Sequence, residues 1–127
     1  MIALDTDVVI DILRSHPPAL VWLRQIQGDV LYLPGLVMME IYQGCRDKRD
    51  QRRVERALST IPMLWPTPSD CDRALADFAK FHLSHSIGLI DCLIAHTAIG
   101  YGLQLATFNA RHYSCLPQLA SMQPYGR

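Results

Sequence analysis

Three carboxylic acids stand inside apolar stretches of the chain, where a protein of this size normally places its core. Asp5 directly follows the apolar start of the chain, Glu40 splits residues 36–42, and Asp91 splits residues 87–95. No Lys or Arg lies within four residues of any of them, so no local ion pair balances the charge. Burying even a neutral polar group without a partner costs about 2–7 kcal/mol. The pattern therefore predicts that the three acids gather around a cation, and a divalent metal ion fits best.

Composition limits the remaining possibilities. A chain of 127 residues, half of them hydrophobic, is expected to form one domain over residues 1–127. Lys+Arg and Asp+Glu are equal at 12 each, so net charge does not identify a partner. No apolar stretch reaches about 20 residues and the N-terminus lacks the features of a signal peptide, which predicts a cytoplasmic protein with no membrane span. The cysteines form no CxxC pair, which indicates reduced thiols: Cys45, Cys71, Cys92 and Cys115.

Short apolar strands alternate with helices along the chain. Strands are expected at residues 1–5, 30–34, 63–65, 103–107 and near 121–123. Helices are expected at residues 8–13, from Pro17 to Gly28, at 36–45, from there to about 59, from a cap at Ser69 or Asp70 to about 85, and at 89–101. This alternation predicts a parallel sheet covered by helices on both faces.

The polar residues fall where such a sheet places its ligand, outside the C-terminal ends of the strands. Asp5 ends the first strand, and Thr107 and Asn109 end the fourth. Glu40 lies in the helix after the second strand, and Asp91 lies at the start of the helix before the fourth. All four segments are therefore expected to meet at one edge. Oxygen ligands of this kind suit Mg²⁺ or Mn²⁺, which can polarise a phosphodiester oxygen and activate a bound water.

Each acid also has a structural interpretation that the residues leave open. Asp5 and Asp91 can cap helices, and Glu40 can be a buried acid bonded to the backbone. Asp7 can be a first-turn acid favoured by the helix dipole. Asp11, one turn later, is interpreted as a solvated surface acid. The structural account requires three separate coincidences, so the metal site is the preferred hypothesis.

Half of the basic residues lie between positions 46 and 56, interleaved with acids. This run is interpreted first as a solvated helix face with pairs of opposite charge, and second as a surface for phosphates. Candidate contacts to an RNA backbone are Arg46, Lys48, Arg49, Arg52, Arg53 and Arg111. His82 and His85 share a helix, but without a third ligand they are not expected to bind a metal.

The ordered set of motifs resembles a known family. Leu4 to Asp11, Glu40 in the helix after the second strand, Ile90 to Ala95, and Ala106 to Tyr113 are together similar to a PIN domain. More narrowly, they resemble a VapC-type toxin of a bacterial toxin–antitoxin pair. The resemblance covers nearly the whole chain and implies a three-layer α/β/α sandwich with a central parallel sheet.

The resemblance also implies an activity and a site. It implies a Mg²⁺-dependent endoribonuclease, in which Mn²⁺ can substitute, with Asp5, Glu40 and Asp91 as metal ligands. Thr6 matches the hydroxyl residue beside the first acid, and Thr107 and Asn109 match the polar residues of the last motif. Relatives often carry Asn or Ser at position 7, which makes Asp7 an auxiliary ligand at most.

The chain departs from the family pattern at one further position, and the resemblance also implies a set of partners. His112 stands where many relatives carry a fourth acid, and this difference favours a site with one metal until substrate binds. The resemblance implies homodimers, inhibition by a small antitoxin of the VapB type, and binding of promoter DNA by the complex only.

Two other functions remain as alternatives. The opening Asp5-Thr-Asp-Val-Val resembles the signature of haloacid-dehalogenase-type phosphatases, in which Asp5 would be the nucleophile and Asp7 a general acid. The chain is short for that class and lacks a convincing later Lys. The second alternative is a non-catalytic interaction module whose acids receive basic residues of a partner chain.

Overall fold

The protein forms one five-stranded parallel sheet with the strand order β3-β2-β1-β4-β5. The computed structural model describes residues 1–127. The strands are β1 (Ile2–Leu4), β2 (Leu31–Pro34), β3 (Met63–Leu64), β4 (Gln104–Ala106) and β5 (Ser121–Met122). The helices are α1 (Thr6–Leu13), α2 (Pro17–Gln25), α3 (Gly35–Gln43), α4 (Lys48–Leu58), α5 (Pro68–Phe81), α6 (Leu89–Gly100) and α7 (Ala110–Tyr113).

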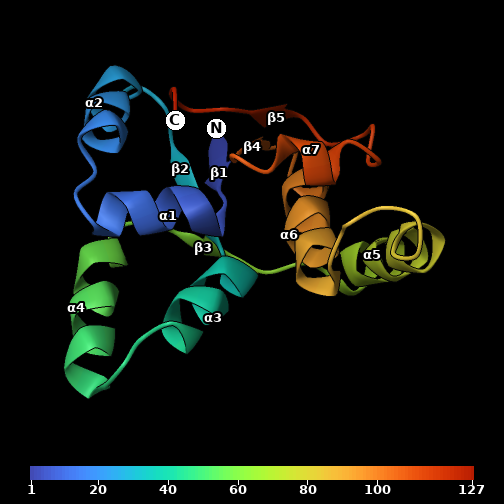
Figure 1. Ribbon diagram of the computed structural model, residues 1–127, viewed down its shortest axis with the longest axis horizontal. Helices are drawn as coiled ribbons and strands as arrows, with labels where there is room; N and C mark the ends of the chain where they lie inside the picture. The colour runs from blue at the N-terminus through green and yellow to red at the C-terminus, as the bar shows by residue number, and fades with distance from the viewer.

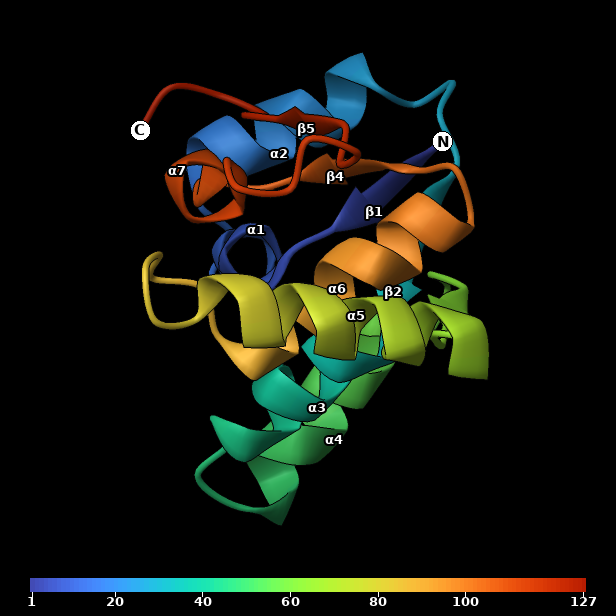
Figure 2. The ribbon, with the colours of Figure 1, turned by 90° about the vertical axis from the view of Figure 1, so that its right-hand side faces the viewer.

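Helices cover both faces of this sheet. In Figure 1, β1 and β2 stand between α2 on one side and the pair α5–α6 on the other, and Figure 2 shows α5 and α6 in front of the strands. A single core of 24 buried apolar residues joins the layers. The predicted α/β sandwich with a central parallel sheet is confirmed. No helix combines the length and the apolar character needed to cross a membrane.

The register of the central strands sets the position of the first acid. Leu4 of β1 is paired with Ala106 of β4, and the Asp5 amide donates to the Ala106 carbonyl at 3.0 Å. Asp5 and Thr107 therefore leave the sheet side by side, one residue beyond their strands. They begin the connections to α1 and α7, at the C-terminal edge where parallel sheets bind ligands.

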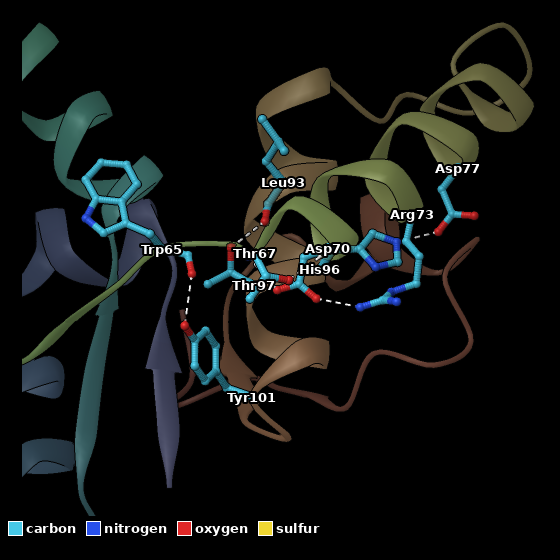
Figure 3. Close-up of polar contacts among 9 residues, drawn as sticks. All are labelled: Trp65, Thr67, Asp70, Arg73, Asp77, Leu93, His96, Thr97 and Tyr101. Carbon is cyan, nitrogen blue, oxygen red and sulfur yellow. Dashed lines mark hydrogen bonds and ion pairs between the residues drawn. The ribbon is translucent and has the colours of Figure 1, made fainter.

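The start of α5 differs from the sequence-based expectation. The N-cap is Thr67, not Ser69 or Asp70, because Pro68 suits the first helical position and Asp70 completes a capping box. Asp70 accepts from the Thr67 amide at 2.9 Å and pairs with Arg73 at 2.6 Å (Figure 3). A side chain at Gly100 of α6 would collide with the Asp70 carboxylate, so this glycine allows the close approach of α5 and α6.

The pair α5–α6 matters for the site because α6 carries Asp91 near its start. The buried ring of His96 lies 2.6 Å through Nε2 from Asp77 of α5, and the Tyr101 hydroxyl donates to the Trp65 carbonyl at 3.1 Å (Figure 3). These bonds fix α6 against α5 and against the segment that follows β3.

Helix α5 ends at Phe81, earlier than expected, and α7 is a four-residue helix that the sequence did not predict.

Candidate active site

Asp5 is the most heavily bonded acid at this edge. It is 4% exposed, and it caps α1 by accepting the Thr6 amide on Oδ1 at 2.8 Å. Its Oδ2 accepts the Thr107 hydroxyl at 2.7 Å and the Tyr113 hydroxyl at 3.2 Å. Three donors therefore fix the carboxylate, yet none of them carries a positive charge. The helix-capping role and a role as ligand are compatible, because capping uses only one of the two oxygens.

The environment of Asp5 disfavours its ionised form. Burial raises the pKa of the Asp5 carboxyl to about 6, and the nearby charge of Asp7 adds to the rise, whereas the bonds from Thr107, Thr6 and Tyr113 lower it. A buried carboxylate without a cation is the kind of group that a divalent ion would stabilise. The same burial, with the charges of Asp5 and Asp91, raises the pKa of Tyr113, so this phenol stays protonated and keeps donating to Asp5.

Thr6 links the first acid to the second. Its backbone amide binds Asp5, and its hydroxyl donates to Glu40 Oε1 at 2.7 Å. Glu40 extends from α3, which packs against α1, and its Oε2 accepts no hydrogen bond within the protein. The family resemblance placed the Thr6 hydroxyl beside the first acid, and the structure shows that this hydroxyl donates to Glu40.

Asp7 has both oxygens engaged by the backbone. Oδ1 accepts the Val8 amide at 2.8 Å, and Oδ2 accepts the Phe108 amide at 3.0 Å. Burial raises the pKa of Asp7, while the positive charge of Arg127 lowers it. Asp7 thus ties the loop after β4 to the first turn of α1. An acid occupied in this way is a poor candidate for a free general acid.

Asp91 lies at the start of α6 and accepts the Gly88 amide on Oδ2 at 3.0 Å. Its Oδ1 accepts no hydrogen bond, so one oxygen remains open after capping. Tyr113 lies close enough to Asp5, Asp7 and Asp91 for all three charges to raise its pKa. Among these acids, Tyr113 bonds directly only to Asp5. Sequence analysis assigned it no role, although it ends the last motif.

The acids fit a divalent cation in chemistry but are not assembled into a finished cage. No group of three or more His, Cys, Asp and Glu side chains is close enough to hold a metal as the side chains stand. None of Asp5, Glu40 and Asp91 takes part in an ion pair. Carboxylate oxygens without a counter-charge are the ligands that hard divalent ions prefer.

Basic residues lie beside Glu40. A hollow of about 410 Å³ between α1, α3 and α4 contains Glu40 together with Arg14, Arg46 and Arg53. A second hollow is lined entirely by charged residues: Arg46, Asp47, Arg49, Asp50, Arg53 and Arg56. Sequence analysis selected Arg46, Arg49 and Arg53 but not Arg56, which belongs to the same basic run. It also missed Arg14, because a neighbour of Glu40 from the end of another helix is not visible as a local pattern.

Other predicted residues lie at the periphery. Asn109 is exposed and precedes α7, where its amide donates to the Thr107 hydroxyl at 2.9 Å, while its side chain contacts none of the acids. Four more are exposed and make no side-chain hydrogen bond to the acids: Lys48, Arg52, Arg111 and His112.

The interpretation of Asp11 as a solvated acid is wrong. Asp11 is 7% exposed, and both of its oxygens bind residues near the C-terminus. Oδ2 accepts the Tyr125 hydroxyl at 2.7 Å, and Oδ1 pairs with Arg127 at 3.1 Å. The partners lie 114 and 116 residues away along the chain, so no local pattern could reveal them.

Comparisons with known proteins give a consistent result. The family model of the PIN domain matches residues 2–115. Ribonuclease VapC10 of Mycobacterium tuberculosis is 36% identical over 121 residues, which cover 94% of this chain and 90% of that protein. Ribonuclease VapC19 of the same organism is 31% identical over 120 residues, which cover 91% and 94%.

Solved structures share the fold. VapBC-1 from nontypeable Haemophilus influenzae superposes with a TM-score of 0.79 at 20% identity and covers 98% of both chains. DNA-bound VapBC from Salmonella typhimurium has a TM-score of 0.79 at 21% identity and covers 97% of both.

Together, the parallel sheet and the acids at its C-terminal edge define an α/β domain of the nuclease type. The chain belongs to the PIN-domain family. Ribonucleases of this family generally depend on a divalent metal.

Proposed function

We propose that this protein is a metal-dependent endoribonuclease and the toxin of a toxin–antitoxin pair. The observation that carries the proposal is that Asp5 is buried without an ion pair and held by three uncharged donors, with Glu40 joined to it through Thr6. Membership of the PIN family and two curated ribonuclease relatives above 30% identity support it.

In this proposal Asp5, Glu40 and Asp91 would hold the ion, with Mg²⁺ the expected metal and Mn²⁺ a substitute. Once bound, such an ion supplies polarisation of the scissile phosphodiester and a water of lowered pKa. Asp7 is a possible auxiliary whose oxygens already hold the backbone of the loop after β4.

The protein's own residues have positioning tasks. Thr6 orients Glu40 through its hydroxyl, and Thr107 and Tyr113 orient Asp5. Because the three donors to Asp5 are uncharged, they fix its direction without neutralising it. Arg46 and Arg53, which line the hollow beside Glu40, would contact RNA phosphates in this proposal, and Arg53 would have to give up its pairing with Asp50 at 3.1 Å.

The partners follow from the same family. Several proteins of similar fold were solved as toxin–antitoxin complexes, one with a fragment of promoter DNA. We therefore expect a VapB-like antitoxin, a homodimer of this chain, and promoter DNA bound only by the complex, in the cytoplasm. The observation that the neighbouring reading frame encodes a small protein with a basic tail would support this partner.

The alternatives fit the geometry less well. In the phosphatase hypothesis Asp7 would donate a proton, but both of its oxygens already accept backbone amides. A phosphorylated aspartate trapped on Asp5 would revive that hypothesis. In the interaction-module hypothesis the protein would bind a partner tightly and bind no divalent metal.

The test is cleavage of total cellular RNA in magnesium by the wild type and by Asp5→Asn and Asp91→Asn, with cut sites mapped. Asp72→Asn is the matched control, because Asp72 is exposed and makes no side-chain hydrogen bond. We expect both site variants and excess EDTA to abolish cleavage and the control to retain it. Full activity in either site variant, or in EDTA, would refute the proposal. Expression of the chain alone should arrest growth, and Asp5→Ala should relieve the arrest.

A further inference from the structure

The segment from Gln123 to Arg127 lies outside the part of the chain that matches the family model, which ends at residue 115. It leaves β5 and passes along α2, as Figure 2 shows. The Tyr125 ring packs between aromatic side chains of three segments. Its centroid is 6.3 Å from Trp22 of α2, 6.1 Å from His16, and 4.9 Å from Phe108 in an edge-on arrangement.

Two polar side chains of this segment close on Asp11 of α1. The Tyr125 hydroxyl and the Arg127 guanidinium each take one oxygen of this buried carboxylate, at 2.7 and 3.1 Å. The Arg127 guanidinium also lies over the Phe108 ring, 4.3 Å from its centroid. Tyr125 and Arg127 therefore each bind Asp11 and Phe108 at once, and these four residues are called the C-terminal clasp below.

Phe108 connects the clasp to the acids. Its amide donates to Asp7 at 3.0 Å, and the preceding Thr107 donates its hydroxyl to Asp5 at 2.7 Å. The loop of residues 107–109 lies between β4 and α7. Within this loop, Thr107 is the residue whose side chain bonds Asp5, and the other side-chain donor, Tyr113, lies in α7. Tyr125 and Arg127 of the clasp therefore contact this loop through the Phe108 ring, while Asp5 and Asp7 bind it through hydrogen bonds.

We propose that Tyr125 and Arg127 are positioning residues for RNA cleavage. By joining Asp11 of α1 to Phe108, they keep the loop where Thr107 orients Asp5. Neither residue touches the metal or the RNA in this account, and both act through Phe108 and Asp11. The proposal rests on the proposed endoribonuclease activity, since it assigns residues that set the geometry of that same site.

The experiment compares Arg127→Gln, Arg127→Lys and Tyr125→Phe with a matched control. Arg73→Gln is that control, because Arg73 is also a half-exposed arginine bound to a buried aspartate, Asp70, at a distance from the loop. Amide hydrogen exchange at Phe108 and Asn109 is measured on the protein without metal or RNA, and kcat and KM are measured on a mapped RNA in magnesium.

We expect Arg127→Gln to speed exchange of the Phe108 amide and to lower kcat by about 10- to 100-fold with KM nearly unchanged, the range that a misplacement of about 1 Å produces. Arg127→Lys keeps a cation over Phe108 and beside Asp11, so its Phe108 amide exchange rate and its kcat should both stay close to those of the wild type. Tyr125→Phe keeps the ring and should show a smaller loss. Arg73→Gln should alter neither readout at the loop.

Unchanged exchange and unchanged kcat in Arg127→Gln and Tyr125→Phe would overturn the proposal. A raised KM with an unchanged kcat would also overturn it, because Arg127 would then bind RNA directly. If Arg127→Gln fails to fold, Arg127→Lys and Tyr125→Phe give the same two readouts. If the wild type cleaves no RNA, the proposed function fails, and exchange at Phe108 still decides whether the clasp holds the loop.

Discussion

The substitution Asp5→Asn should change how the stability of the metal-free protein depends on pH. Burial and the charge of Asp7 raise the pKa of Asp5 from 3.8 to about 6 in the folded state. At about 1.4 kcal/mol per pH unit, this rise means that ionised Asp5 lowers the free energy of unfolding by about 3 kcal/mol. An amide at this position carries no charge and avoids that penalty.

The sign of the pH dependence follows from proton binding. Between pH 3.8 and about 6 the folded state holds the proton on Asp5 and the unfolded state does not. Stability contributed by this group is therefore fully present below the lower value, falls as the pH rises through this window, and stays low above about 6. The amide variant lacks this decline.

The substitution also weakens hydrogen bonds, which reduces the gain. Asparagine keeps an oxygen for the Thr6 amide, but its NH2 group cannot accept from the hydroxyls of Thr107 and Tyr113 as Oδ2 does. Two buried hydroxyls lose their acceptor, at about 1–3 kcal/mol each, and this loss offsets most or all of the gain of about 3 kcal/mol at neutral pH. The difference in stability between the two proteins should nevertheless change by about 3 kcal/mol between acidic and neutral pH.

The assay is urea unfolding in EDTA across this pH range, with Asp72→Asn as the control for an exposed acid. Adding magnesium should raise the stability of the wild type more than that of the variant, because an ion that binds only the folded state stabilises it. A stability difference that does not vary with pH would refute the reasoning and would mark Asp5 as a conventional helix cap.

Four further perturbations test other parts of the account. Asp91→Asn should leave the metal-free protein as stable or more stable while weakening Mn²⁺ binding by calorimetry, and a large drop in melting temperature would instead make this acid structural. Thr107→Val should cost about 1–3 kcal/mol in urea unfolding and lower kcat, because it removes a donor to Asp5 and an acceptor for the Asn109 amide. A loss of stability without a loss of rate would contradict its positioning role. Asp77→Asn should destabilise the α5–α6 pair by about 1–3 kcal/mol, since the buried ring that it binds has no second partner, and equal stability would contradict this. Arg46→Gln should lower the salt dependence of RNA binding by roughly one phosphate contact, and an unchanged slope would remove this residue from the RNA surface.

The fold was predictable because the sheet is buried on both faces. Strands in such sheets are short apolar runs, and the residues that end them are the polar positions that sequence analysis selected. Boundaries set by capping were less predictable. Thr67 caps α5 through a reciprocal bond with Asp70, and Pro68 at the first helical position indicates this cap, but sequence analysis chose Ser69 or Asp70 instead. The short helix α7 has too few residues to show a periodicity.

Tertiary contacts explain what the sequence could not predict at the site. The acids were visible because each is out of place in its local run. The roles of Tyr113 and Asp11 were not visible in the sequence. A tyrosine at the end of a motif and an acid on a helix both have ordinary local explanations, as a core residue and as a solvated surface residue. Their roles depend on partners more than 100 residues away, Asp5 for the first and Tyr125 for the second. Burial of a polar group is informative only after the fold has brought its partner to it.

The structural and functional interpretations of the acids are not alternatives in this fold. Asp5 is the N-cap of α1, and Asp91 lies in the first turn of α6, where it accepts the Gly88 amide; each uses one carboxylate oxygen for this bond to the backbone. A helix N-terminus carries a partial positive charge that favours a nearby anion, which reduces the cost of placing several acids close together. Capping therefore allows the chain to fold with these charges before any metal is bound, and it fixes the direction of each side chain. If these acids hold a cation as proposed, the same residues would serve both as capping groups of their helices and as its ligands.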